Sequence, residues 1–496
     1  MTTEHNGQTG GVGWRLEQSY RRLPAHCFAE QPPVPVRGPR VVIVNHALGD
    51  SLGLDLRGLD HDQAAAVFAG NLLPDGSVPI AQAYAGHQYG HFTMLGDGRA
   101  ILLGEQVTPS GDRFDLQLKG SGRTRYSRGG DGRAALGPML REYIISEAMA
   151  ALGIPSTRSL AVVTTGESVF RGTALPGAVL TRVAASHIRV GTFEYFRAVD
   201  DPQGLKSLAD YTIDRHFLEL RDAEDRYLEL LRAVAERQAA LVASWMHVGF
   251  IHGVMNTDNM AVSGETIDYG PCAFMDRYDP ATVFSSIDRH GRYAYANQPG
   301  IAQWNLDRFA ESLHPLHPLL DDDPDRAAAR SDEVIAGFAD RFQHHWLAGM
   351  RRKSGLVNEE PGDLSLIQSL LKWMYGKRQD YTNTFREIAV PGIPAADVYD
   401  DPEFLDWHAR WHERRARQGL AAEAVIGLMK SVNPAVIPRN HLVEEALEAA
   451  TERSDLGPLH RFLEVLARPF EERAYEARYR LPAPPELQNY QTFCGT

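Results

Sequence analysis

Apolar and polar side chains alternate over short stretches in the first part of the chain, and this pattern is typical of strands. The clearest case is residues 114–118, which alternate as a half-buried strand does and end at Lys119. Residues 94–95 and 100–103 flank a Gly-Asp-Gly-Arg turn sequence at 96–99, which predicts a strand–turn–strand unit. Short apolar runs predict the other strands, at residues 41–44, 160–165 and 178–183.

A helical period of apolar residues dominates the second part of the chain. Residues 227–248 form a long amphipathic stretch, and helices are also expected at 60–73 and 140–152, the last stopped by Gly153. A strand-rich half before about residue 200 and a helix-rich half after it predict an α+β protein with two lobes and a cleft between them. The positions expected to be buried along 227–248 are Leu228, Leu231, Val234, Ala235, Leu241, Val242 and Trp245.

Composition narrows the functional classes. The 496 residues are 43% hydrophobic and 23% charged, which is ordinary for a globular protein. A net charge of −13 argues against a general nucleic-acid binder, which would present a basic face. The N-terminus lacks a signal-peptide pattern, and three cysteines form no disulfide framework. We therefore expect a cytoplasmic monomer without nucleic-acid or membrane partners.

The stretch over residues 252–270 carries the most specific signal in the chain. Its order of residues matches the catalytic and metal loops of protein kinases, His-x-Asp-x-x-x-x-Asn followed by Asp-x-Gly. Asn259 and Asp268 occupy the metal positions of that pattern, but Val254 stands where the kinase base belongs. A carboxylate is present instead at Asp258. The pattern predicts a kinase-like site whose chemistry differs at the base.

Asn259 and Asp268 supply an amide oxygen and a carboxylate, the hard ligands that Mg²⁺ or Mn²⁺ needs when it shares the phosphate oxygens of a nucleotide. Each residue alone would be interpreted as a turn residue, because Asn and Asp are common in turns. Their combination with His252, Gly253 and a long preceding helix favours a metal site.

Lys119 ends a predicted strand, and the next predicted helix carries Glu142. That order matches the lysine–glutamate ion pair with which kinases hold the lysine on the nucleotide phosphates. Glu147, on the same helix, is a rival for the role. The alternative is a surface lysine and a glutamate on a solvated helix face, but the downstream loops favour the ion pair.

Glycines and arginines gather near Lys119. Backbone amides around Gly96 and Gly98 can approach a phosphate closely, because glycine has no Cβ. The third glycine of the kinase loop is absent, so an ordinary turn is the alternative. Clustered arginines in an acidic protein predict binding of several phosphate charges, with a solvated surface as the alternative. These arginines are Arg123, Arg125, Arg128 and Arg133 in a glycine-rich loop, and Arg182 and Arg189 at strand ends.

His87 and His91 are four residues apart, a spacing compatible with zinc binding on a helix. The glycines around them argue against a helix, and no third ligand accompanies them. Structural histidines are therefore the favoured interpretation.

Six long and specific segments share the pattern of one family: residues 82–88, 95–100, 117–124, 130–136, 181–189 and 252–270. Together they resemble the selenoprotein O family, called YdiU in bacteria. The matches run from near residue 14 to the C-terminus, so the resemblance covers nearly the whole chain.

The resemblance implies a bilobal protein-kinase-like fold that binds ATP in an inverted pose. Such enzymes use Mg²⁺ or Mn²⁺ to transfer AMP to Ser, Thr or Tyr hydroxyls of other proteins, and UTP is an alternative donor. On this chain the implied proton acceptor is Asp258, the metal ligands are Asn259 and Asp268, and Glu142 is the partner of Lys119. The implied nucleotide contacts are Gly96, Gly98, Arg99, Lys119, Asp131, Gly132, Arg182, Arg189 and Asp268.

The same resemblance divides the chain into three parts. We expect residues 1–80 to form an N-terminal extension that packs on the N-lobe. Residues 81–200 would form the N-lobe, which binds the nucleotide phosphates. Residues 201–496 would form the helical C-lobe, with the catalytic and metal loops and a C-terminal extension.

Animal relatives carry a selenocysteine three residues from the terminus, and Cys494 holds that position here. Some bacterial relatives pair this cysteine with one in the loop beyond the Asp-Tyr-Gly sequence, where this chain has Ser285 and Ser286. Cys272 is the nearest candidate, and it lies much closer to Asp268 in sequence. A Cys272–Cys494 disulfide is left open, and two free thiols in non-reduced peptides would exclude it.

Three functions are open on these motifs and on what the resemblance implies. The first is a protein adenylyltransferase, the second an ordinary kinase, and the third an inactive ATP-binding scaffold. The absence of an acid at Val254 counts against a kinase. The presence of Asp258, Asn259 and Asp268 together counts against a scaffold, which needs neither metal ligands nor an extra carboxylate.

Overall fold

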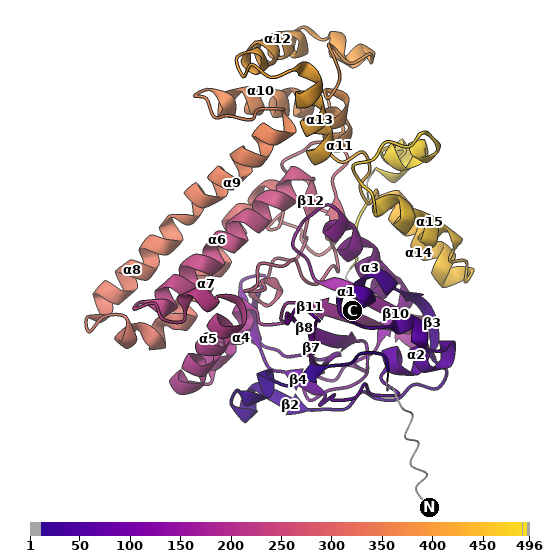
Figure 1. The fold of residues 1–496 in the computed structure, drawn as a ribbon, viewed down its shortest axis with the longest axis vertical. Coiled ribbons are helices and arrows are strands. Elements are labelled where there is room, and N and C mark those ends of the chain that lie inside the picture. The colour runs from indigo at the N-terminus through magenta and orange to yellow at the C-terminus, as the bar shows by residue number, and fades with distance from the viewer. Residues whose placement is uncertain (1–10, 489, 494–496) are drawn as a thin grey trace, which may run out of the picture.

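A computed structural model describes residues 11–488 and 490–493. One antiparallel sheet is formed by nine strands of this part of the chain (Figure 1): β1 (Leu16–Glu17), β2 (Phe28–Glu30), β3 (Arg40–Val44), β4 (Ile80–Gln82), β7 (Ala100–Val107), β8 (Arg113–Lys119), β9 (Ala134–Ala135), β10 (Arg158–Arg171) and β11 (Thr173–Ala184). Their order is β2-β4-β7-β8-β11-β10-β3, with β1 beside β7 and β9 beside β11. The predicted strand-rich N-lobe is confirmed.

Alternation along β8 divides its side chains between the two faces of the sheet. Leu116 joins an apolar cluster that includes Phe68 of α2 (His61–Ala69). Gln117 and Lys119 point to the opposite face, which looks into the cleft. Both faces are covered, so even Lys119 is only 5% exposed. This sheet therefore presents buried polar groups to the cleft.

Strands β5 (Ala85–Gln88) and β6 (His91–Met94) form a separate two-stranded sheet. The strand–turn–strand unit predicted over residues 94–103 is therefore wrong, because β6 pairs with β5 and not with β7. Asp97, in the expected turn, is buried, and its Oδ2 accepts a hydrogen bond from Gln82 N at 3.2 Å. This hydrogen bond fixes residues 95–99 to β4, so they do not form a tight turn between β6 and β7.

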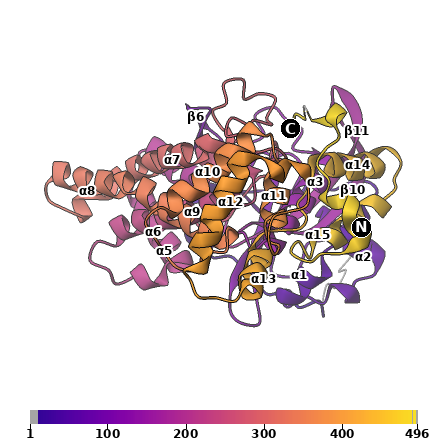
Figure 2. The same cartoon turned by 90° about the horizontal axis from the view of Figure 1, so that it is seen from above.

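The second half of the chain is mostly helical (Figures 1 and 2). Helix α6 (Arg226–His247) occupies the predicted amphipathic stretch, and all seven positions expected to be buried along it are buried. It packs against α7 (Gln298–Leu313) and α9 (Phe338–Lys353). The α+β class and the helical C-lobe are confirmed. The other helices are α1 (His46–Ser51), α3 (Leu136–Ala151), α4 (Val190–Ala198), α5 (Pro202–His216), α8 (Pro324–Ala336), α10 (Asp363–Gly376), α11 (Tyr381–Glu387), α12 (Pro402–Ala416), α13 (Ala422–Val432), α14 (Asn440–Glu452) and α15 (Gly457–Leu466).

The last two helices return to the first lobe. Helices α14 and α15 pack on α3, and both views show them beside it (Figures 1 and 2). Helix α3 is thus held between the sheet and these C-terminal helices, which fixes the side chains that it directs into the cleft. Within the described residues, no helix combines the length and the apolar character needed to cross a membrane.

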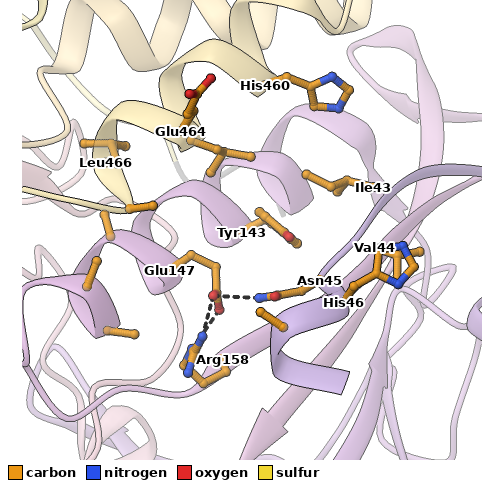
Figure 3. A pocket seen from close by; sticks show the side chains of 16 residues that line it. Ile43, Val44, Asn45, His46, Tyr143, Glu147, Arg158, His460, Glu464 and Leu466 are labelled. Atoms are coloured by element: carbon orange, nitrogen blue, oxygen red, sulfur yellow. Dashed lines mark hydrogen bonds and ion pairs between the residues drawn. The ribbon is translucent and has the colours of Figure 1, made fainter. Parts of the chain in front are cut away.

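A cavity of about 540 Å³ lies behind α3, between this helix, β3 and α15 (Figure 3). Glu147 faces this cavity. It accepts hydrogen bonds from Asn45 Nδ2 at 2.7 Å and from Arg158 Nε at 2.9 Å. Glu147, the rival partner for Lys119, is therefore occupied away from the cleft.

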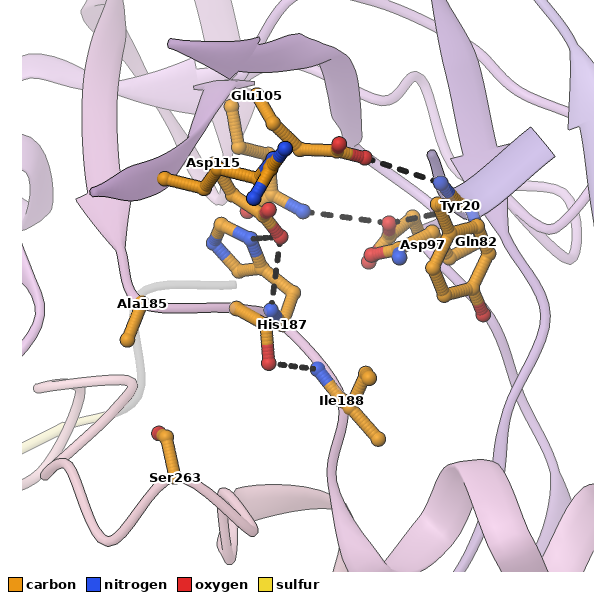
Figure 4. Close-up of polar contacts among 12 residues, drawn as sticks. Tyr20, Gln82, Asp97, Glu105, Asp115, Ala185, His187, Ile188 and Ser263 are labelled. Atoms are coloured by element: carbon orange, nitrogen blue, oxygen red, sulfur yellow. Dashed lines mark hydrogen bonds and ion pairs between the residues drawn. The ribbon is translucent and has the colours of Figure 1, made fainter. Parts of the chain in front are cut away.

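The segment between β11 and α4 links the two lobes, and His187 ties it to the sheet. The His187 backbone N–H and ring Nδ1 both contact Asp115 Oδ2, at 2.9 and 3.0 Å (Figure 4). Arg215 of α5 donates to the other oxygen of Asp115 at 2.9 Å. Burial lowers the pKa of His187, so the ring is neutral at pH 7. This anchoring places Arg189 at the inner end of the cleft.

Lys353, the last residue of α9, is buried beside aromatic rings. Its ammonium lies 4.3 Å from the centre of the Phe385 ring, and no carboxylate of the described residues pairs with it. Burial lowers its pKa from 10.5 to about 7. Between these two values the unfolded chain binds a proton that the folded chain does not. The free energy of unfolding should therefore rise with pH through this window, by about 1.4 kcal/mol per pH unit.

Lys353→Met should remove this dependence. The measurement is urea unfolding of wild type and variant at pH values across the window, with exposed Lys372→Met on α10 as the control. Equal pH slopes for wild type and Lys353→Met would contradict the assignment.

Candidate active site

Lys119 and Arg182 enter the cleft from neighbouring strands. Arg182 on β11 lies opposite Gln117, two residues from Lys119 on β8, so both cations share one face of the sheet. Lys119 Nζ donates to Glu142 Oε2 at 2.7 Å, and Arg182 Nε donates to Glu142 Oε1 at 2.8 Å. The structure thus brings together the predicted lysine–glutamate pair, and Glu142 holds a second cation as well.

Asp268 closes this cluster from the C-lobe. Lys119 donates to its Oδ1, and Arg182 Nη2 donates to the same oxygen at 3.2 Å. Burial opposes ionisation of Asp268, but the two cations outweigh it and hold its pKa well below the usual range. Lys119 and Arg182 carry more donors than these contacts use, so they can also bind phosphate oxygens.

The loop before Asp268 places Asp258 at the cleft. His252 anchors the loop through a 2.9 Å contact between its Nε2 and the Ile267 carbonyl. Asn259 Nδ2 donates to the Val254 carbonyl at 3.1 Å. Val254 stands at the position of the kinase base, and its apolar side chain is buried. Asp258 is 8% exposed, and burial raises its pKa to about 6 against the opposing charge of Arg189.

Arg189 supports the backbone of this loop. Its Nη1 donates to the Asp258 carbonyl at 3.2 Å, and its Nε donates to the His187 carbonyl at 3.1 Å. The guanidinium stacks on the Tyr84 ring, 4.3 Å from the ring centre. Arg189 therefore lies between the loop that carries Asp258 and the Tyr84 ring, a neighbour that no sequence motif predicts.

The β5–β6 hairpin packs directly on the catalytic loop. His87 N donates to Thr257 Oγ1 at 2.7 Å, and Tyr89 N donates to Asn256 Oδ1 at 3.0 Å. His87 Nδ1 also contacts the Glu194 carboxylate of α4. His87 thus has the structural role that its glycine-rich surroundings predict, and the hairpin determines the position of the loop that carries Asp258.

Gly86 allows this close approach. A Cβ at this position would lie 2.6 Å from Asp258 Oδ1, well inside van der Waals contact. Gly86→Ala should therefore displace the carboxylate and lower turnover, on the order of a hundredfold for a shift near 1 Å. Gly427→Ala on α13, where an added Cβ meets nothing within 4 Å, is the matched control. Turnover of Gly86→Ala equal to that of the control would contradict the packing.

A cavity of about 530 Å³ opens onto Asp258. Gly96 and Gly98 form part of its wall, and Tyr126 packs against both. An added Cβ would lie 2.4 Å from the Tyr126 ring at Gly96 and 2.9 Å from the Tyr126 carbonyl at Gly98. Lys119, Arg182 and Arg189 are buried and are not among the residues that line this cavity, but Lys119 and Arg182 contact Asp268, which does line it. The predicted site residues that line the cavity are Gly96, Gly98, Arg99, Asp131, Gly132, Asp258, Asn259 and Asp268.

Asp131 is already paired in this cavity. Arg171, at the end of β10, donates to both of its carboxylate oxygens at 2.8 Å. These hydrogen bonds lower the pKa of Asp131 to about 2. Arg171 was missed from the sequence, because it is 40 residues from Asp131 and lies in no recognised motif. Its guanidinium adds a cation to the cavity wall.

The two predicted metal ligands retain suitable oxygens. Asn259 uses its amide nitrogen on the Val254 carbonyl, which leaves Oδ1 directed away from that bond. The contacts of Asp268 with Lys119 and Arg182 use its Oδ1, which leaves Oδ2 available. An amide oxygen and a carboxylate oxygen at one cavity match the ligand preference of Mg²⁺ or Mn²⁺. The residues present therefore fit such an ion.

Cys272 lies close behind Asp268 in the chain and is fully buried. Burial raises the pKa of its thiol to about 12, so the reactive thiolate is disfavoured. Cys494 lies outside the described residues, and the question whether the two cysteines pair stays open.

Known proteins are similar to this chain over nearly its whole length. Over residues 14–467 the chain matches the family described as protein adenylyltransferase SelO. It is 60% identical to a protein nucleotidyltransferase YdiU of Halalkalibacterium halodurans over 100% of both chains. It is 58% identical to one of Syntrophotalea carbinolica, over 98% of this chain and 99% of the relative. The chain belongs to the SelO family.

SelO membership confirms the resemblance that the six sequence segments indicated. It also makes the chain an enzyme of the nucleotidyltransferase type with a kinase-like fold. The ordinary kinase and the inactive scaffold are not favoured. The roles of individual residues in this SelO chain stay predictions.

Proposed function

We propose that this protein transfers AMP from ATP to Ser, Thr or Tyr hydroxyls of other proteins and releases pyrophosphate, with UTP as an alternative donor. One observation carries the proposal. Val254 fills the position of the kinase base, while Asp258 turns a buried carboxylate toward the cavity, one residue before Asn259. A carboxylate at this position can accept a proton from a hydroxyl that attacks a phosphorus near the cavity opening. Lys119 and Arg182 would then bind the phosphates that lie farther inside.

The charge distribution supports an inverted nucleotide. Lys119, Arg182 and Arg189 are all 5% exposed or less. They contact Asp268 and Asp258 of the cavity wall, and in this proposal they form the inner cationic end of the site. The two outer phosphates carry most of the negative charge of ATP, so they are drawn to this end. The α-phosphorus then faces the opening, next to Asp258. Arg99, Asp131 and the backbone of Gly132 contact the nucleotide closer to the opening.

The reaction follows from that pose. The hydroxyl oxygen of the acceptor forms a bond to the α-phosphorus, and the bond from that phosphorus to the bridging oxygen of the β-phosphate breaks. Asp258 orients the hydroxyl and accepts its proton. Lys119 and Arg182 offset the negative charge of the departing pyrophosphate. Mg²⁺ or Mn²⁺ held by Asn259 and Asp268 would offset negative charge on the phosphate oxygens.

The proposal also covers the acceptor, the compartment and the oligomeric state. The acceptor hydroxyl belongs to a protein side chain, which can enter the cavity opening and reach the buried Asp258 carboxylate. We infer the cytoplasm as the compartment, which the low cysteine count supports. We also infer a monomer that uses neither nucleic acid nor membrane as a partner.

Two labelled substrates test the proposal. The protein is incubated with Mg²⁺ or Mn²⁺, a protein mixture, and ATP labelled at either the α- or the γ-phosphate. Label from the α position alone should enter protein. Label from only the γ position would support a kinase, and label from neither would support a scaffold.

A further inference from the structure

A second cavity adjoins the nucleotide cavity. Its volume is about 740 Å³, and it lies between the tip of the β5–β6 hairpin and residues 287–301, a region called the acceptor groove below. Tyr89 and Ile287 line both cavities. Gln88, next to Tyr89, contacts Asp258 Oδ2 at 3.5 Å. A chain seated in the groove would therefore reach the nucleotide cavity on the side of Asp258.

The charge that the groove presents is positive. Arg289 is exposed and forms no ion pair with the described residues. Arg292 is held at the wall, with its guanidinium 4.9 Å from the centre of the Trp304 ring. Asp288 also lines the groove and offsets one of these charges; its two oxygens accept the backbone N–H groups of Arg292 and Tyr293 at 2.9 and 2.8 Å, and it is 7% exposed. The two arginines still leave the lining with a net positive charge.

This local sign is opposite to that of the whole chain, which carries a net charge of −13. Two further histidines, His91 and His290, line the groove and add hydrogen-bond donors. A cationic groove beside a catalytic opening on an acidic protein attracts acidic segments selectively and repels basic ones.

Apolar side chains also line the groove. Ile287 is 56% exposed, and Ile301 lines the groove as well. Large apolar side chains exposed beside a cationic groove are typical of a surface that contacts a partner. The groove can thus hold a segment that combines acidic and apolar residues.

We propose that the acceptor groove binds the target protein and selects hydroxyl residues flanked by acidic side chains. The bound segment lies along the hairpin tip, with its hydroxyl directed past Tyr89 and Ile287 toward Asp258. Arg289 and Arg292 contact the flanking carboxylates. This inference rests on the proposed AMP transfer, and it adds the chemical class of the acceptor.

The test uses the full chain, ATP labelled at the α- or γ-phosphate, and a positional-scanning peptide library with a central Ser, Thr or Tyr. Label from the α position should concentrate on peptides with Asp or Glu beside the hydroxyl. Added salt should weaken this preference, because it screens exposed charges. Arg289→Glu should abolish or reverse the preference by raising KM for acidic peptides, with ATP affinity unchanged.

Arg352→Glu on the exposed end of α9 is the matched charge reversal and should leave the preference intact. Transfer of α-label without any charge preference, or equal effects of the two variants, would overturn the proposal. Competition by a DNA oligonucleotide but not by an acidic peptide would also overturn it. Transfer of γ-label with the acidic preference retained would contradict AMP transfer yet support the groove.

Discussion

Asp258→Asn should lower the rate of AMP transfer by about a hundredfold to ten-thousandfold, the range that a general base contributes. The amide has the same shape as the carboxylate but cannot accept the hydroxyl proton. Oδ1 of Asp258 has no hydrogen-bond partner among the described residues, so the substitution breaks no existing bond of that atom. ATP affinity should be unchanged, because the deep cations that hold the outer phosphates are untouched.

The measurement is single-turnover transfer of α-label with saturating ATP, together with ATP binding by calorimetry. Asp332→Asn, the same chemical change on the exposed face of α8, is the control and should retain wild-type transfer. Transfer by Asp258→Asn at the rate of this control would remove Asp258 from the chemistry. Loss of ATP binding together with transfer would instead indicate a binding role.

Asp268→Ala should abolish detectable transfer, for two reasons that act together. It removes the carboxylate expected to hold the metal ion, and a lost electrostatic contact of this kind costs about a hundredfold or more in rate. It also removes an anion that Lys119 and Arg182 share, so that among the described residues Glu142 alone would pair with these two buried cations. Both cations would then be less well positioned for the outer phosphates.

Metal-dependent ATP binding separates these effects. Wild type should bind ATP more tightly when Mn²⁺ is present, and Asp268→Ala should lose that gain. Asp268→Asn is the matched variant, since it keeps the side-chain size and one oxygen but removes the charge. Transfer by Asp268→Ala near the wild-type rate, or an undiminished gain from Mn²⁺, would exclude Asp268 from the metal site.

Residues with a fixed spacing in one motif could be placed from the sequence. Asp258, Asn259 and Asp268 belong to a single loop pattern, and the structure puts all three on one cavity. Lys119 and Glu142 follow the strand–helix order of kinases, and they form the expected ion pair. In these cases local order along the chain and closeness in space coincide.

Contacts between distant segments could not be placed in this way. Arg171 reaches Asp131 only because β10 and β11 form a longer hairpin than the apolar runs at 160–165 and 178–183 predict. The partner of β6 was mistaken because the glycine-rich sequence at 96–99 resembles a hairpin turn. Its Asp97 is instead bound by groups on other strands of the sheet, which no local pattern contains.

The orientation of the nucleotide is the central claim, and a crystal structure with a non-hydrolysable ATP analogue and Mn²⁺ tests it most directly. The α-phosphorus should lie next to Asp258, the terminal phosphate should contact Lys119 and Arg182, and the ion should lie between Asn259 and Asp268. A terminal phosphate at the cavity opening beside Asp258, with the α-phosphate buried, would contradict the account.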